Sequence, residues 1–418
     1  MVLPPYSLEQ AIEKTVREEW GRILAALVKT LHDIQLAEDS LQDAVEAAIT
    51  TWQERGLPKS PAGWLITTAR RKAIDRIRRA KNFAQKQSEI SYLVDLENAA
   101  LDQPEPESIP DKRLEMIFTC CHPTLAEKTQ TALTLRTIGG LTTHEIARAF
   151  LDNPTAMAQR LVRAKKKIKL ANIPYEIPDT GALPERVKGV LAVIYLIFNE
   201  GYAASSGPTL IRIDLIEEAI RLARIMAHLM PEETEVSGLL ALMLLHDSRR
   251  HARQNKDCTM VPLDQQNRSL WNKARAGEGT ALLKQTLAKG RIGPYQLQAS
   301  ISALHVEAAS WTETDWPQIA ALYGLLYSIQ PSPVVRINQA MAVSHAVSVE
   351  AALTMINEVN ETADMTGYQS YYVAKSDLMK RAGKPEEAKV LLAHAITLAN
   401  NDIDRAFLQE KHSQLSEP

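Results

Sequence analysis

The stretch from Thr131 to Lys169 reads TALTLRTIGGLTTHEIARAFLDNPTAMAQRLVRAKKKIK, and it predicts two helices joined by a tight turn. Thr142 and Glu145 have the spacing of a capping box, in which each side chain caps the backbone of the other at a helix start. The turn falls at residues 151–153 (LDN), whose asparagine is a favourable N-cap. Pro154 follows at the first helical position, where its missing N–H costs nothing. The pattern is that of a helix-turn-helix.

The second of these helices, residues 154–169, has two chemically distinct faces. One face is apolar at helical spacing and is expected to pack inward; its members are Met157, Leu161, Ala164 and Ile168. The other is polar and basic, without an acid: Thr155, Gln159, Arg160, Arg163 and Lys166, with Lys165, Lys167 and Lys169 beside them. Such a helix suits major-groove reading with phosphate anchoring. An ordinary hairpin with a solvated basic face is the alternative, but the turn chemistry and the one-sided charge favour DNA binding.

Length and charge limit the class of protein. A chain of 418 residues is long enough for two or three domains with substantial cores. Lys and Arg outnumber Asp and Glu by 25 to 22 in residues 1–175, whereas the acids lead by 28 to 23 in residues 176–418. Any nucleic-acid function therefore belongs to the first part. Amphipathic helical spacing recurs nearly everywhere, which predicts an all-α fold.

Cysteine usage and hydropathy favour a cytoplasmic protein. The three cysteines, Cys120, Cys121 and Cys258, cannot form a disulfide framework. The N-terminus shows neither the basic nor the apolar segment of a secretion signal. The longest apolar run, residues 190–198, is too short to span a bilayer. We therefore predict a cytoplasmic protein without a membrane partner.

Residues 7–81 are predicted to form the first domain. A helical apolar stripe runs through Leu41, Ala44, Val45, Ala48, Ile49 and Trp52. Acids recur on another face at Asp39, Asp43 and Glu46, either as a solvated face or as a contact surface. After a break at residues 56–58 (GLP), residues 62–81 hold seven basic residues and one acid, with Trp64 near the start. This helix can hold phosphates while the ring supports an unstacked base, although a core position is the commoner place for a lone tryptophan.

Residues 82–110 are predicted to be a linker, because their polar composition and the proline spacing of QPEPESIP do not support long helices. Two basic helical modules, residues 7–81 and 111–171, therefore flank a flexible acidic tether. The order and spacing of these modules, rather than either one alone, make the pattern specific.

Three stretches of the first 171 residues resemble bacterial RNA polymerase sigma factors of the sigma-70 family, in the extracytoplasmic-function group. AEDSLQDAVEAAITTW (37–52) is similar to the polymerase-clamp helix of the second sigma domain, and GWLITTARRKAIDRIRR (63–79) to the adjoining segment that reads the minus-ten element. Residues 139–168 resemble the fourth domain, which reads the minus-thirty-five element. LEMIFTCCHP, AMAQRLVRAK, IYLIFNEGY and GLLALMLLHD further resemble the subgroup with a long C-terminal extension.

The resemblance implies a set of contact residues. Core polymerase would be bound by Asp39, Gln42, Asp43 and Glu46. The melted promoter strand would be held by Arg70, Arg71, Lys72, Arg78 and Arg79, with Trp64 and Thr67 nearby. The upstream element would face Thr155, Ala156, Ala158, Gln159, Arg160 and Arg163, with Lys166 on a phosphate. Thr155 and Ala158 depart from the small residue and the lysine that many relatives have there.

The motif FTCCHP at residues 118–123 invites a metal interpretation. Cys120, Cys121 and His122 cannot converge on one ion from a single helix, because successive side chains point about 100° apart. No second cysteine pair exists to complete a tetrahedral site. Buried thiols followed by a helix-ending His-Pro are therefore the better account, and we predict no metal and no cofactor.

Residues 184–418 read as successive helices of TPR-like type. Residues 338–342 and 372–376 lie 34 positions apart, and residues 383–400 have the pattern of a TPR second helix. Further helices are expected at 214–230, 232–247, 294–310 and 316–329. Stacked hairpins leave a groove, which predicts a protein partner. In FNEGY (198–202), Gly201 is expected as a left-handed C-cap with Tyr202 packed behind it, or Glu200 and Tyr202 form a regulatory contact.

Two other classes of function compete with a transcription initiation factor that binds core RNA polymerase and promoter DNA. A one-component regulator with a TPR-like sensor would share the helix-turn-helix, but it would not need the acidic stripe paired with the basic helix at 62–81. An enzyme could use His305 with Glu307, or His246 with Asp247, as an acid–base pair. Neighbouring or alternate helical positions do not face one another, so we predict no catalytic residues. The promoter sequence, the inducing signal and the direction of any regulation do not follow from the sequence.

Overall fold

The structure is a computed structural model that describes residues 8–81, 111–150, 152–203, 211–255, 259–399 and 402–415. Every regular element in these ranges is a helix, which confirms the predicted all-α fold. The chain divides into two compact units, Met1–Val193 and Ile194–Pro418. Among the described helices, none has the length and apolar character needed to cross a membrane. The predicted linker at 82–110, Leu151 of the predicted turn and Cys258 lie outside the described residues.

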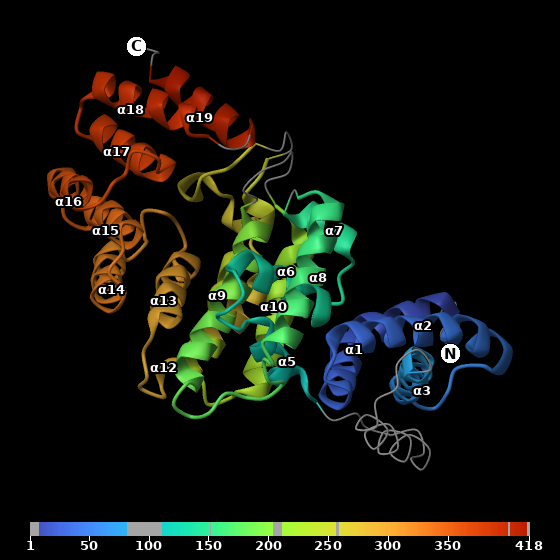
Figure 1. Ribbon diagram of the computed structural model, residues 1–418. Coiled ribbons are helices and arrows are strands. Elements are labelled where there is room, and N and C mark those ends of the chain that lie inside the picture. Colours follow the sequence, from blue (N-terminus) through green and yellow to red (C-terminus); the bar gives the residue numbers. More distant parts are fainter. Residues whose placement is uncertain are drawn as a thin grey trace, which may run out of the picture. The chain divides into compact units, whose positions relative to one another are not determined.

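Three long helices open the first unit (Figure 1, blue): α1 (Leu8–Leu31), α2 (Ile34–Arg55) and α3 (Pro61–Lys81). Asp33 begins α2, because its Oδ1 accepts a hydrogen bond from the Leu36 N–H at 3.1 Å. Gly56 ends it with a φ of +80° and donates to the Trp52 carbonyl at 3.0 Å. The predicted break at 56–58 is therefore confirmed.

The apolar stripe of α2 forms much of the core of these three helices. Leu41, Ala44, Ala48 and Trp52 are buried as predicted, and Val45 is half-buried. The prediction is wrong for Ile49, whose exposed fraction is 45%. Ile49 lies about 80° around the helix from Leu41, at the edge of the stripe, and no helix of the described part covers that edge.

Four shorter helices follow in the first unit (Figure 1, teal): α5 (Arg113–Cys120), α6 (Glu127–Thr137), α7 (Thr143–Ala149) and α8 (Pro154–Leu170). Cys120 and Cys121 end α5 with their thiols directed at α6, where Sγ lies 3.1 Å from Thr137 Oγ1 and 3.5 Å from Thr134 Oγ1, respectively. Burial raises the pKa of Cys120 to about 12 and that of Cys121 to about 11. Both thiols are therefore protonated at neutral pH, which supports the prediction of structural cysteines.

α9 (Leu183–Tyr202) contains the boundary between the units, and the second unit continues with helices of 13 to 17 residues. They are α10 (Ile213–Leu229), α11 (Thr234–Asp247), α12 (Lys273–Leu287), α13 (Pro294–Glu307), α14 (Trp316–Ile329), α15 (Pro333–Ala346), α16 (Val349–Thr362), α17 (Gln369–Arg381), α18 (Pro385–Thr397) and α19 (Asp402–Gln414). In the described residues between α11 and α12, short 3-10 helices lie at Arg250–Ala252, Leu263–Gln265 and Arg268–Leu270. The four helices predicted between residues 214 and 329 correspond to α10, α11, α13 and α14.

The end of the second unit is built from successive helix pairs (Figure 1, orange to red). α15 packs on α16, and α17 packs on α18, so the two sequence segments that lie 34 residues apart fall on the first helix of each pair. Ile337, Ile356 and Leu378 lie in the apolar core that α15, α16 and α17 share. Each pair thus buries one face against the next, as expected of a helical repeat.

Gly201 does not have the predicted role. It lies inside α9 and is absent from the glycines with positive φ, so the predicted left-handed C-cap is wrong. Instead the backbone of α10 comes close: a Cβ at Gly201 would lie 2.8 Å from the Ile216 nitrogen and 3.0 Å from the Arg212 carbonyl oxygen. Glycine is needed here because α9 and α10 approach each other closely. This requirement depends on residues of α10 and does not follow from the residues next to Gly201.

Candidate nucleic-acid interface

The helix-turn-helix is positioned by two local capping devices. At the start of α7 the Thr142 N–H donates to Glu145 Oε2 at 2.7 Å, and the Glu145 N–H donates to Thr142 Oγ1 at 3.2 Å. This confirms the capping box. At the start of α8 the Asn153 Oδ1 accepts from the Thr155 N–H at 2.8 Å, with Pro154 in the first turn. Both helix starts are therefore set by residues within three positions of them.

α8 presents one buried and one exposed face. The four predicted inward residues, Met157, Leu161, Ala164 and Ile168, are all buried. Thr155, Gln159, Arg163 and Lys166 are exposed, whereas Ala156, Ala158 and Arg160 are half-buried. Arg160 forms an ion pair with Asp152 at 2.7 Å, so it must exchange that partner before it can contact DNA.

Val162 belongs to the exposed face of α8 and was missed by the sequence reasoning. Its exposed fraction is 58%, and it lies one turn from Gln159 and Lys166. An apolar side chain on a groove-reading face can contact the methyl group of thymine. The signal was present in the sequence, because an aliphatic residue between charged positions on a polar face has no packing role.

α3 carries the second set of cations. Arg71, Arg78 and Arg79 are exposed, and Thr67, Arg70 and Lys72 are half-buried. Burial lowers the pKa of Arg70, and its Nε is buried without a hydrogen-bond partner among the described residues. Arginine remains charged under these conditions. Arg70 is thus a charged, half-buried side chain among the cations of α3.

The position of Trp64 agrees with both interpretations of the sequence, a core residue and a ring beside the cations of α3. Its ring is half-buried and meets the buried Trp52 edge to face, with ring centres 5.4 Å apart at 68°. One edge of Trp64 therefore belongs to the core of the three-helix segment. The remainder is accessible beside the cations of α3, and Trp52 holds it in a fixed orientation.

The acidic stripe of α2 is partly paired with α3. Arg76 binds Asp43 through two bonds of 2.9 Å and lies 3.8 Å from Asp39. Both carboxylates keep about a third of their side-chain surface exposed, at 34% for Asp39 and 30% for Asp43. Gln42 and Glu46 are exposed on the same helix. The stripe is therefore an accessible acidic surface with Arg76 as a basic neighbour.

Glu38 is a second residue that the sequence reasoning missed. Only 4% of its side chain is exposed, and it forms ion pairs with Arg136 of α6 and Lys165 of α8. A carboxylate buried to this degree requires such partners. The signal was its position: Glu38 follows Ile34 by one turn and precedes Leu41 by three residues, which places a charge inside the apolar stripe.

The two acid–base pairs considered for catalysis are not assembled. His246 Nε2 lies 2.9 Å from Ser302 Oγ, while Asp247 binds Arg250 at 2.6 Å and also pairs with Arg275. His305 lies against Trp311 and Trp316, and Glu307 pairs with Lys284 at 3.6 Å. Each histidine and its candidate carboxylate thus face different neighbours. Among the described residues, no group of His, Cys, Asp and Glu could hold a metal ion.

The low pKa of His305 predicts that the second unit loses stability in acid. Burial, followed by the charges of Arg249 and Arg268, lowers the pKa of His305 to about 4. The unfolded chain takes up this proton near pH 6.5, so stability is fully present above about pH 6.5 and is lost as the pH falls toward 4, by roughly 3 kcal/mol in total. His305→Phe keeps an aromatic ring beside the two tryptophans and removes the proton site. We expect urea unfolding midpoints at pH 7.5 and pH 5 to differ less for His305→Phe than for the parent; an equal difference would contradict this origin.

The end of the segment FNEGY (198–202) packs within the second unit. The Tyr202 ring stacks on Phe198 with ring centres 5.5 Å apart, and the Arg253 guanidinium carbon lies 3.5 Å from the Tyr202 ring centre. Arg249 donates to the Tyr202 hydroxyl at 3.3 Å. Tyr202 therefore has a packing role within this unit, and Glu200 beside it is half-buried.

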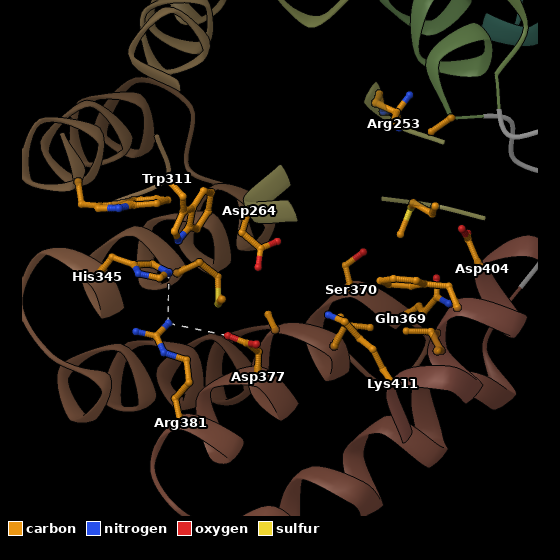
Figure 2. Close-up of a pocket in the computed structure, with 18 residues that line it drawn as sticks. Arg253, Asp264, Trp311, His345, Gln369, Ser370, Asp377, Arg381, Asp404 and Lys411 are labelled. Atoms are coloured by element: carbon orange, nitrogen blue, oxygen red, sulfur yellow. Dashed lines mark hydrogen bonds and ion pairs between the residues drawn. The ribbon is translucent and has the colours of Figure 1, made fainter. Parts of the chain in front are cut away.

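A cavity of about 740 Å³ lies in the second unit between α15, α17 and α19 (Figure 2). At one end the rings of Trp316 and His345 stack 4.3 Å apart, and Arg381 lies 3.3 Å from His345 Nε2. Away from these groups the lining includes Arg253, Asp404 and Lys411, all labelled in Figure 2. Aromatic and mixed-charge ends in a cavity of this size suit a ligand with apolar and polar parts. The sequence did not reveal it, because its lining comes from segments far apart in the chain.

Comparison with known proteins places the chain in a family. Residues 16–83 match the model described as Sigma-70 region 2, residues 115–168 match Sigma-70, region 4, and residues 186–287 match a family of unknown function (DUF6596). An uncharacterized protein of Rhizobium meliloti (strain 1021) is 39% identical over 395 residues, which covers 94% of this chain and 93% of that protein. No solved structure matches the chain. α3 and the acidic stripe lie in the first matched region and the helix-turn-helix in the second, so the chain belongs to the sigma-70 family of RNA polymerase sigma factors and carries a C-terminal extension.

Proposed function

We propose that the protein is a transcription initiation factor of the extracytoplasmic-function group that binds core RNA polymerase and directs it to specific promoters. The observation that carries the proposal is the pairing of two basic, exposed helices with an acidic surface: α3 and α2 in one sigma region, and α8 in the other. A DNA-binding regulator needs the helix-turn-helix alone. Two separate cationic helices beside an acidic docking face suit a factor that holds two promoter elements and a polymerase together.

Initiation without any other sigma factor is the test of this function. The full chain is mixed with core RNA polymerase and a library of promoter fragments, and transcripts are sequenced. We expect defined start sites with shared upstream elements. DNA binding without initiation would instead favour the alternative, a one-component regulator with a TPR-like sensor.

At residue level, the proposal assigns the domains 7–81 and 111–171 to the two promoter elements, and the residues from 184 to 418 to a TPR-like extension. Arg70, Arg71, Lys72, Arg78 and Arg79 would hold the melted strand, with Trp64 and Thr67 beside them. The extension would regulate or position the sigma regions, with Glu200 and Tyr202 as a regulatory contact. A segment of a protein partner would occupy the cavity between α15, α17 and α19, since both apolar and charged groups line it.

Asp39 and Asp43 are expected to bind core polymerase. Replacing both with alanine should weaken core binding by about tenfold at low salt, because two accessible carboxylates lose their basic partners on the polymerase. Arg76→Ala is the matched control, since it breaks the same intramolecular pairs but leaves the acids in place. Core affinity is measured by fluorescence anisotropy at several salt concentrations. Equal loss in the Arg76→Ala variant would show that the pairs act within the fold instead.

A further inference from the structure

Acidic and basic side chains line the cavity between α15, α17 and α19 in equal numbers, but they are unevenly distributed. The acids are Asp264, Asp377 and Asp404, and the bases are Arg253, Arg381 and Lys411. Because these charges cancel, the cavity as a whole does not favour a single anion or a single cation. What distinguishes it is the order of the charges from one side to the other.

Aromatic rings mark one side of the cavity, which we call the ring side. The Trp316 and His345 rings stack with their centres 4.3 Å apart, and Trp311 meets Trp316 edge to face at 4.6 Å. All three residues belong to the lining. The faces of such rings attract cations, and tryptophan attracts them most strongly.

Acids outnumber bases on the ring side. Burial lowers the pKa of His345, and the charges of Asp377 and Asp264 oppose this shift, so both carboxylates lie near the ring. Arg381 lies 3.8 Å from Asp377 and donates two hydrogen bonds to Ser344, at 2.7 and 2.8 Å. Asp264 forms no ion pair or side-chain hydrogen bond with another described residue. The ring side therefore suits a cation.

Bases outnumber acids on the side away from the rings, which we call the basic side (Figure 2). Arg253 is held by Tyr202, whose ring centre lies 3.5 Å from the guanidinium carbon and whose carbonyl accepts an N–H. Lys411 Nζ lies 5.1 Å from the Phe407 ring centre. Neither cation forms an ion pair within the described part of the chain, and Asp404 supplies the acid of this side. The basic side therefore suits a carboxylate.

Neutral polar groups at the start of α17 complete the lining. Gln369 and Ser370 line the cavity, and their side chains form no hydrogen bond with other described residues. An amide and a hydroxyl can both donate and accept, as a peptide group requires. Met341 and Val373 add apolar surface. An extended peptide has backbone groups for the first pair and side chains for the second.

We infer that this cavity selects a peptide segment of a partner protein that carries one basic and one acidic side chain, with the basic one on the ring side and the acidic one on the basic side. This inference rests on the proposed partner site of the extension and names the chemistry that the site recognises. A volume of about 740 Å³ accommodates a short segment and not a folded domain. A segment with the opposite order of charges would place like charges together, which gives the site its specificity.

The class of peptide is tested with a random heptapeptide library displayed on phage and selected on the full chain. We expect the bound sequences to combine a Lys or Arg with an Asp or Glu, at one separation and in one order. Sequences with charges of a single sign, or sequences without a shared pattern, overturn the inference. A selected peptide is then made with a fluorescein label, and its affinity is measured by anisotropy.

Two substitutions test which side holds which charge. Lys411→Gln removes a cation from the basic side, and Asp264→Asn removes a carboxylate from the ring side. Each should weaken the selected peptide by about tenfold, because one charge pair is lost. When the acid of the peptide is replaced with Gln, Lys411→Gln should cost below about twofold and Asp264→Asn should still cost about tenfold. Replacing the base of the peptide with Gln should give the reverse.

The matched controls are Lys380→Gln on α17 and Glu410→Gln on α19. Both residues are exposed on helices that contribute to the lining, but neither belongs to it. Each control should stay within about twofold of the parent, because exposed charges outside the cavity are screened. Circular dichroism shows whether each full-length variant keeps its helix content. Asp264 is exposed and lies outside the long helices, so Asp264→Asn keeps the test open if Lys411→Gln unfolds.

Unchanged affinity in both cavity variants overturns the site, since the selected peptide then binds elsewhere. Equal losses with every form of the peptide overturn the assignment of the two charges to the two sides. The measurement needs neither polymerase nor DNA. A chain that initiates transcription but binds no peptide therefore overturns this inference alone, and a chain that binds the peptide as expected but does not initiate contradicts the proposed function alone.

Discussion

Replacing Arg163 with alanine is expected to weaken binding to the selected promoter element by about 1–3 kcal/mol and to relax the choice of base at one position. Arg163 is exposed on α8, where its Nε donates to the Gln159 carbonyl at 3.3 Å, a long bond that a base edge can replace. Arg160→Ala should fall at the lower end of the same range, because Arg160 must first leave Asp152.

Lys166→Ala is the control for base reading. Lys166 is exposed on α8, so its loss should weaken all sequences alike and reduce the salt slope by about one. Gel-shift titrations on selected and scrambled duplexes at several salt concentrations separate the two effects. Unchanged discrimination in both arginine variants would remove α8 from the major groove.

Asp247→Asn is expected to destabilise the second unit by about 3–5 kcal/mol, because it takes the anion from a buried charge cluster. Asp247 has 1% of its side chain exposed and binds Arg250 and Arg275, which also share Glu217 at 2.8 Å. Glu217→Gln is the matched control. Its side chain is 44% exposed, so its loss should cost below about 1 kcal/mol. Urea unfolding of the full chain gives both values.

The same variant tests whether the extension takes part in initiation. At a temperature where Asp247→Asn has melted the second unit and Glu217→Gln has not, we expect transcription by the two variants to differ substantially. Equal transcription would mean that the extension is a passenger, and the proposal that it positions or regulates the sigma regions would be wrong. The first unit serves as an internal reference, since neither substitution lies within it.

The features that sequence predicted well depend on neighbours a few positions away. The capping box at Thr142 and Glu145, the cap at Asn153 and the four inward residues of α8 all follow from helical geometry. Glu38 shows the limit: its partners lie 98 and 127 residues away, and periodicity shows only that a charge interrupts a stripe. Gly201 was assigned to a local turn because its close neighbour, the start of α10, is not visible in the local pattern.

The construction of α8 allows the residues proposed to contact bases to be replaced as a set. Asn153 and Pro154 set where the helix begins, and four inward side chains pack it into the core. Positions 155, 159, 162 and 163 can therefore be randomised together to retarget the factor to new promoters at little cost in folding. Lys165 and Lys169 should be kept constant in such libraries, because they contact α2 instead of taking part in base choice. Selected variants would then differ in the promoters that they recognise while keeping the same contacts between α8 and α2.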